Sequence, residues 1–167
     1  HVVMPAIHLK KEQIADTFRD HHATLDPGRP LDEPRQMTEE ARVKLREKFF
    51  AADVGITGAN MLIAETGSIV VVTNEGNGDL TQTLPRVHIV LATIEKVLPR
   101  VEDALSIIRL LARSATGQEI TCYTTFATGA RRDGDLDGPQ EFHLVLMDNG
   151  RTRLLESEFR DVLRCIR

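Results

Sequence analysis

Residues 69–73, of sequence IVVVT, constrain the fold more than any other stretch of the chain. The apolar, β-branched side chains of such a segment point to both faces, which is typical of a strand buried on both sides in a parallel or mixed sheet. Residues 87–92 have the same character, whereas residues 101–112 show the three- and four-residue apolar spacing of an amphipathic helix. Strands alternating with helices predict an α/β fold: a layered sheet with flanking helices, and residues 69–73 near its centre.

The other expected elements have weaker patterns. Thr38 supplies an N-cap oxygen ahead of a helix, and the two glycines within residues 53–60 are expected to interrupt regular structure. The further expected elements are strands over residues 1–4, 61–64, 120–126 and 142–147, helices over 10–24, 39–51 and 156–164, and loops or turns over 26–34, 74–79 and 148–150.

The charge and the cysteine content exclude several classes of protein. A net charge of −4 and a pI near 5.9 leave no broad basic surface, which argues against binding to nucleic acid or to anionic membranes. The apolar runs are too short to span a bilayer. The two cysteines, Cys122 and Cys165, fall in different expected elements, so we expect no disulfide framework and a cytoplasmic location.

Polar and glycine residues gather around the central strand, where loops of open α/β sheets commonly bind ligands. Exposed amides and hydroxyls there are suited to a small carboxylate or to a phosphate or CoA-type ligand. The alternative is that the glycines only satisfy turns. The candidate ligand-binding residues are Gly58, Asn60, Thr66, Gly67, Ser68, Asn74, Glu75, Gly76 and Asn77.

Two titratable residues near this strand are candidates for chemistry. Glu65 directly precedes Thr66, and a carboxylate beside a buried strand is a candidate nucleophile or base. The alternative is a solvated or ion-paired glutamate. For His88 a structural hydrogen bond is expected rather than a role in a site, and the six histidines show no metal-binding spacing.

Three segments, residues 53–60, 63–68 and 72–78, closely resemble the LUD domain family of lactate-utilisation iron-sulfur proteins. Residues 3–8, 85–89 and 159–167 also resemble it, so the resemblance covers nearly the whole chain. It implies a fold similar to the sugar-isomerase and CoA-transferase superfamily, followed by a ferredoxin-like domain with two [4Fe-4S] clusters. We therefore expect residues 1–164 to be the later part of a LUD domain. Residues 165–167 would begin the truncated cluster domain, with Cys165 as its first metal ligand and no cofactor in this fragment.

The resemblance also implies a function. In the family, a three-subunit bacterial system oxidises L-lactate to pyruvate and transfers the electrons. Our leading hypothesis is a ligand-binding or assembly domain whose partners are the other subunits, and which is inactive by itself. The rival is a CoA- or acyl-transferase-like or isomerase-like enzyme domain that uses Glu65, and a third reading is a purely structural domain. Sheet edges or apolar faces left uncovered by a missing first part would permit a homodimer.

Overall fold

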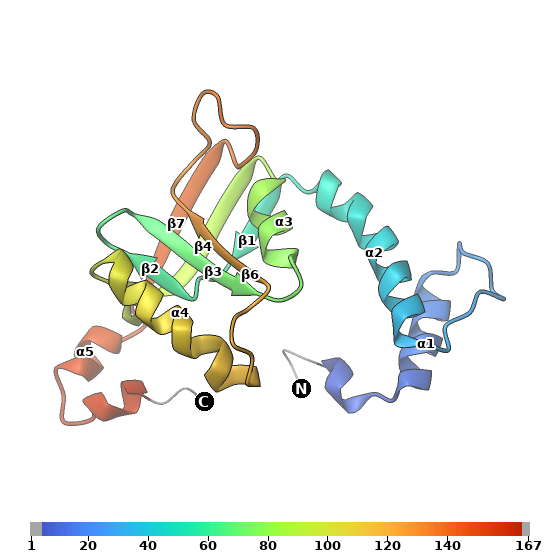
Figure 1. Cartoon of the computed structure of the whole chain (residues 1–167), viewed down its shortest axis with the longest axis horizontal. Coiled ribbons are helices and arrows are strands. Elements are labelled where there is room, and N and C mark those ends of the chain that lie inside the picture. The colour runs from blue at the N-terminus through green and yellow to red at the C-terminus, as the bar shows by residue number, and fades with distance from the viewer. Residues whose placement is uncertain (1–4, 165–167) are drawn as a thin grey trace. The chain divides into compact units, whose positions relative to one another are not determined.

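The computed structural model describes residues 5–164 and divides into two compact units, His1–Lys48 and Phe49–Arg167 (Figure 1). The expected strand over residues 1–4 lies outside the described residues. The chain next forms a short 3-10 helix, η1 (Pro5–His8), followed by the helices α1 (Lys11–His21) and α2 (Pro34–Ala51). The two long helices confirm the expected helices in this region, with different ends.

Helix α2 begins earlier than expected, at Pro34 rather than after Thr38. A proline fits the first turn of a helix because its missing N–H would have no partner there. Thr38 is therefore not the N-cap, and its hydroxyl donates to the carbonyl oxygen of Pro34 at 2.9 Å inside the helix. The core of this unit consists of the buried Ala15, Leu31 and Met37.

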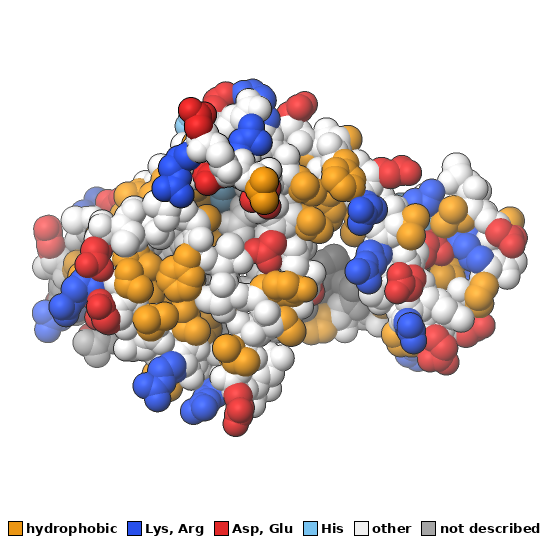
Figure 2. All heavy atoms as spheres, turned by 45° about the horizontal axis from the view of Figure 1, so that its top comes forward, with side chains coloured by type: hydrophobic (Ala, Val, Ile, Leu, Met, Phe, Trp, Pro, Cys, Tyr) orange, Lys and Arg blue, Asp and Glu red, His pale blue; other side chains and the backbone are white. Residues whose placement is uncertain are grey.

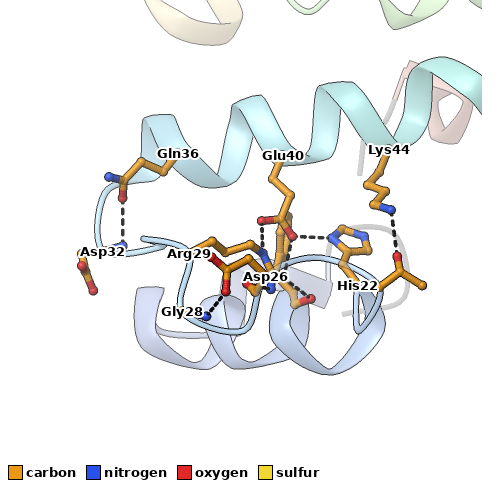
Figure 3. Close-up of polar contacts among 10 residues, drawn as sticks. His22, Asp26, Gly28, Arg29, Asp32, Gln36, Glu40 and Lys44 are labelled. Atoms are coloured by element: carbon orange, nitrogen blue, oxygen red, sulfur yellow. Dashed lines mark hydrogen bonds and ion pairs between the residues drawn. The ribbon is translucent and has the colours of Figure 1, made fainter.

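A buried carboxylate joins α2 to the loop before it (Figure 3). The Arg29 guanidinium donates from Nε and Nη2 to the two oxygens of Glu40, at 2.6 and 2.9 Å. The Nδ1 atom of His22 lies 2.6 Å from Glu40 Oε1. Hydrogen bonding by Arg29 lowers the pKa of Glu40 to about 2 although burial opposes this shift.

The second unit contains two sheets, one of three strands and one of four. The three-stranded sheet is parallel, in the order β1-β4-β7, and comprises β1 (Val54–Thr57), β4 (Val87–Thr93) and β7 (Glu141–Met147). The four-stranded sheet is mixed, in the order β5-β2-β3-β6, and comprises β5 (Val97–Leu98), β2 (Met61–Ile63), β3 (Ser68–Thr73) and β6 (Tyr123–Ala127).

Five strand predictions are confirmed and one prediction is wrong. Strands β2 and β6 match the expected strands 61–64 and 120–126, with β6 beginning at Tyr123. Strands β3, β4 and β7 lie where the apolar runs place them, and β3 is an inner strand of its sheet. Residues 53–60 were expected to interrupt regular structure, but β1 lies among them and pairs with β4 from Val54 to Thr57. The local glycine content misleads here because the neighbouring strand β4 provides hydrogen-bond partners for β1.

Among the helices of this unit, the expected helix 101–112 is confirmed, whereas the expected loop 74–79 and the expected helix 156–164 are wrong in part. Helix α4 (Val101–Thr116) has the expected start and ends at Gly117, whose φ of 74° lies in the left-handed region. Residues 77–79, expected as a loop, instead begin α3 (Asn77–Thr83). The expected helix 156–164 is replaced by α5 (Arg151–Leu155) and the 3-10 helix η3 (Arg160–Arg164), with a further 3-10 helix η2 (Ile94–Lys96) before β5.

Two side chains explain the change near the end. Asp148 caps α5, since its Oδ1 accepts from the Thr152 backbone N–H at 2.7 Å, so the helix starts directly after the expected turn. The Ser157 hydroxyl donates to the carbonyl oxygen of Leu154 and accepts from the Phe159 N–H. These local hydrogen bonds compete with a continuous helix.

Strand β3 separates two hydrophobic cores. Ile69 and Val71 pack into the core between the two sheets, with Val90 of β4. Val70 packs on the opposite face, in the core beneath Ala104 of α4. The four-stranded sheet is thus a middle layer between the parallel sheet and α4, and the expected burial of β3 on both faces is confirmed.

The outer face of the parallel sheet carries exposed apolar side chains, together with the exposed Glu141 and His143 of β7. In the parallel register, alternate residues of β1, β4 and β7 share this face. Figure 2 shows further patches of exposed hydrophobic side chains on the face of this unit that is turned toward the viewer. The exposed apolar residues of the outer face are Val54, Ile56, Leu91, Val145 and Met147.

Candidate functional site

A groove of about 370 Å³ lies where β1, β3 and α3 meet. Its walls are the ends of β1 and β3 and the first turns of α3, so it brings together parts of the segments 53–60 and 74–79, which were expected from the sequence to be irregular. All of its lining side chains are uncharged. The lining residues are Ile56, Thr57, Gly58, Ala59, Asn60, Val71, Val72, Thr73, Asn77, Gly78 and Thr81.

The position of α3 depends on a glycine in β1. A Cβ built on Gly55 would lie 1.9 Å from the carbonyl oxygen of Thr81, so only a glycine permits the helix to approach the strand this closely. Asp79 of α3 also accepts hydrogen bonds from Gln82 and from the Thr125 hydroxyl of β6. The groove wall formed by α3 is therefore fixed at both the parallel and the mixed sheet.

Two asparagines of the expected site line the groove. The side-chain Oδ1 of Asn60 accepts from the Val72 N–H at 2.8 Å, and its own N–H donates to the Val70 carbonyl at 2.9 Å, so Asn60 fastens the loop after β1 to β3. The Oδ1 of Asn77 accepts from the Gly78 N–H at 2.9 Å. Both side chains therefore hold local backbone, and within residues 5–164 their amide nitrogens have no acceptor and remain as donors.

A buried histidine stands behind the groove wall. His88 of β4 is 1% exposed, and its Nε2 lies 2.8 Å from the Thr57 hydroxyl oxygen. Its ring also makes an edge contact with Phe142, with centroids 5.6 Å apart. Burial lowers the pKa of His88, so the imidazole is neutral at neutral pH. The expected structural hydrogen bond of His88 is confirmed, and its partner lines the groove.

The residues at the start of β3 do not join the groove. Glu65 is exposed, and its Oε2 accepts from the Val101 N–H at 3.2 Å, at the first turn of α4. Thr66, Ser68 and Thr128 form a chain of hydroxyl hydrogen bonds of 2.7 and 2.6 Å. A six-residue strand spans about 20 Å, so the two ends of β3 cannot serve one small ligand. The predicted polar cluster is therefore not a single group.

The loop after β3 also turns away from the groove. Asn74 donates to the Gln118 side chain and accepts from the Cys122 N–H, so it holds the segment before β6. Gly76 has a φ of 72°, and a Cβ built on it would lie 3.6 Å from the Tyr123 ring. Glu75 is exposed and accepts from the Asn74 N–H. Like Gly67, whose φ is 68°, Gly76 occupies a left-handed turn, which is the alternative that the sequence left open.

Metal-ligating side chains do not cluster in the part of the chain that the structure describes: no group of three or more His, Cys, Asp or Glu residues there could hold a metal ion. Cys165, the proposed cluster ligand, lies outside the described residues. Within residues 5–164, no helix is long and apolar enough to cross a membrane.

Comparisons with known proteins give consistent results. The model of the LUD domain family matches residues 1–147. Proteins named lactate utilization protein B match all 167 residues, with 47% identity in Geobacillus sp. (strain WCH70) and Bacillus subtilis (strain 168) and 48% in Shouchella clausii (strain KSM-K16). The chain spans 34% of the length of each of these relatives.

A crystal structure of a DUF162 family protein from Deinococcus radiodurans is 18% identical, with a TM-score of 0.44 over 60% of this chain and 56% of that one.

Proposed function

Because the chain belongs to the LUD domain family, we propose that it is the LUD domain of a lactate-utilisation protein and binds a small carboxylate in the groove between β1, β3 and α3. The observation that carries this proposal is the lining of the groove. It offers hydroxyl and amide groups beside apolar side chains, and none of its eleven residues is charged. Such a lining suits a compact ligand that accepts a few hydrogen bonds.

The same lining discriminates between the two expected ligand classes. Phosphates and CoA carry several negative charges, and proteins usually bind them with Arg, Lys or the N-terminus of a long helix. The groove lacks Arg and Lys, and α3 is only seven residues long. A monocarboxylate such as L-lactate or pyruvate needs fewer charge-assisted contacts, so we favour it over a phosphate or CoA compound.

The family relationship supports a wider proposal for the longer protein. There the LUD domain would act in binding and assembly within a cytoplasmic complex that oxidises L-lactate to pyruvate. Electrons would pass through two [4Fe-4S] clusters on a following domain, whose first ligand would be Cys165. The fold would be that of the sugar-isomerase and CoA-transferase superfamily.

A thermal-shift and calorimetry screen tests the groove as the binding site. L-Lactate, pyruvate, CoA, acetyl-CoA and sugar phosphates would be added separately, since a ligand of the folded state raises the melting temperature. We expect a shift with lactate or pyruvate and none with the phosphorylated compounds. A shift with CoA alone, or with no compound, would contradict the proposal.

A pair of variants locates the site. A Cβ on Gly58 would meet only the carbonyl oxygen of Leu91, at an ordinary contact distance of 3.9 Å, and Gly58 does not have a positive φ. Gly58→Phe therefore adds a bulky ring at a residue of the groove lining without a clash at Cβ. Gly28 lies in an exposed loop of the first unit with similar space, and Gly28→Phe is the matched control. We expect only Gly58→Phe to abolish the shift. Equal shifts in both variants would place the ligand elsewhere.

A further inference from the structure

We propose that His88 and Thr57 form a donor relay in the groove: His88 donates from Nε2–H to the Thr57 hydroxyl oxygen, and the Thr57 O–H donates to a carboxylate oxygen of the ligand. This inference rests on the proposed function, because it assigns the hydrogen bond that orients the same small carboxylate. Thr57 would be the residue that touches the ligand, and His88 would be a positioning residue.

The geometry that carries this inference is a polar pair at the edge of the groove, formed by the buried His88 and the half-buried Thr57. Thr57 ends β1 and lines the groove, whereas His88 lies on the neighbouring strand β4, opposite Gly55, two residues before Thr57. The two side chains share the inner face of the parallel sheet, and their atoms are 2.8 Å apart. A ring that is 1% exposed cannot reach a ligand itself, so it acts through the hydroxyl.

The direction of the two hydrogen bonds follows from the chemistry of the ligand. A carboxylate only accepts hydrogen bonds, so the Thr57 hydroxyl has to present its proton to the groove. Its oxygen then accepts from His88, which requires the neutral tautomer with the proton on Nε2. Serial hydrogen bonds polarise one another, so donation from His88 makes the hydroxyl a stronger donor.

The surroundings of His88 keep this arrangement in one protonation state. Burial lowers its pKa, and no charged side chain is among the causes of that shift. The ring contacts Thr57 from β1 and Phe142 from β7, neither of which ionises near neutral pH. The relay therefore supplies a neutral donor, which matches a groove without charged side chains.

Other groove donors could hold the second carboxylate oxygen. Asn77 keeps a free amide nitrogen because only its Oδ1 is used in the described part of the chain. Thr73 lines the same groove, and its hydroxyl has no hydrogen-bond partner among the described residues. Thr57 differs from these two because a buried partner fixes its rotamer, so it would dominate orientation.

Calorimetric titration of L-lactate and pyruvate into the 167-residue chain tests the relay with three variants. Thr57→Val removes the hydroxyl, and we expect binding about 10- to 100-fold weaker, as for the loss of a hydrogen bond to a charged group. Thr57→Ser keeps the hydroxyl and should bind within about threefold of the original chain. Thr83→Val changes a hydroxyl of α3 outside the groove lining and should bind as the original chain does.

Nitrogen-15 NMR of the His88 ring gives a second measurement that does not depend on a variant that may fold poorly. We expect the Nε2-protonated neutral form at pH 7, and a change of the Nε2 signal when lactate or pyruvate is added. A purely structural hydrogen bond would leave that signal unchanged on titration. An Nδ1-protonated ring in the bound state would overturn the relay.

The outcomes separate the two proposals. If the original chain binds lactate or pyruvate and Thr57→Val binds equally well, the relay is refuted and the groove proposal stands. If the original chain binds neither compound, both proposals are refuted. Weaker binding in Thr57→Val, recovery in Thr57→Ser and a ligand-dependent Nε2 signal would together establish the relay.

Discussion

Gly55→Ala should destabilise the second unit far more than a methyl group usually does. The new Cβ would lie 1.9 Å from the Thr81 carbonyl oxygen and 3.1 Å from Pro85 Cγ. Real Cβ atoms essentially never approach within 3.0 Å, so the α3 backbone would have to move by about 1 Å. Overpacking against backbone costs about 3 kcal/mol, near the upper end of the usual range.

Urea unfolding measures this cost directly. With an m-value of about 2 kcal/mol per M, a loss of about 3 kcal/mol lowers the unfolding midpoint by about 1.5 M. Gly58→Ala is the matched control, because its Cβ would be 3.9 Å from the nearest atom, the carbonyl oxygen of Leu91, and Gly58 does not have a positive φ. It should change the free energy of unfolding by less than about 0.5 kcal/mol. Equal midpoints for the two variants would refute the close contact between α3 and β1.

Three further predictions concern the two glutamates whose contacts the structure defines. Glu40→Gln removes a carboxylate whose side chain is 8% exposed, so the free energy of unfolding of the first unit should fall by about 3 kcal/mol. The control Glu39→Gln, at an exposed position, should leave that free energy almost unchanged. Amide NMR signals of α1 during urea unfolding would measure both values, and equal losses would contradict the prediction. The pKa of Glu40 is about 2 in the folded state and near 4.3 in the unfolded state. Its contribution to the stability of the first unit is therefore present above about pH 4.3 and is lost as the pH falls toward 2. An acid titration followed by the amide NMR signals of α1 would detect this loss. Glu65→Ala removes the acceptor of the Val101 N–H at the first turn of α4, so it should cost about 1 kcal/mol of stability. Binding of the carboxylate, measured by calorimetry, should be unchanged. Weaker binding or lost turnover would instead support the enzymatic hypothesis.

The sequence predicted the strongest elements and missed those with weak local patterns. Strand β3 and helix α4 follow from apolar periodicity, because periodicity reports directly which faces are buried. Strand β1 and helix α3 were missed because their segments contain glycine and asparagine, which locally favour turns. Both elements are stabilised by partners distant in the chain, β4 for the strand and β6 for the helix.

The residues of the candidate site were likewise predicted only in part. Gly58, Asn60 and Asn77 were predicted as ligand-binding residues and do line the groove. Glu65 has so far only a structural contact, and a catalytic role for it stays a prediction. Thr57 belongs to the polar cluster around the central strand but was not singled out as a ligand-binding residue, because nothing local distinguishes its hydroxyl from that of any other strand-end threonine. Only its pairing with His88, 31 residues away, makes it notable.

The sequence by itself therefore determined the α/β class, the central buried strand and the family, because these depend on local periodicity and on the residues themselves. The tertiary structure decided which polar residues share a site, because β3 holds its two polar ends about 20 Å apart. It also decided where α3 lies, since the contact between Gly55 and Thr81 exists only once strand and helix have packed. Proximity between segments distant in the chain is a property of packing, and the groove consists of such contacts.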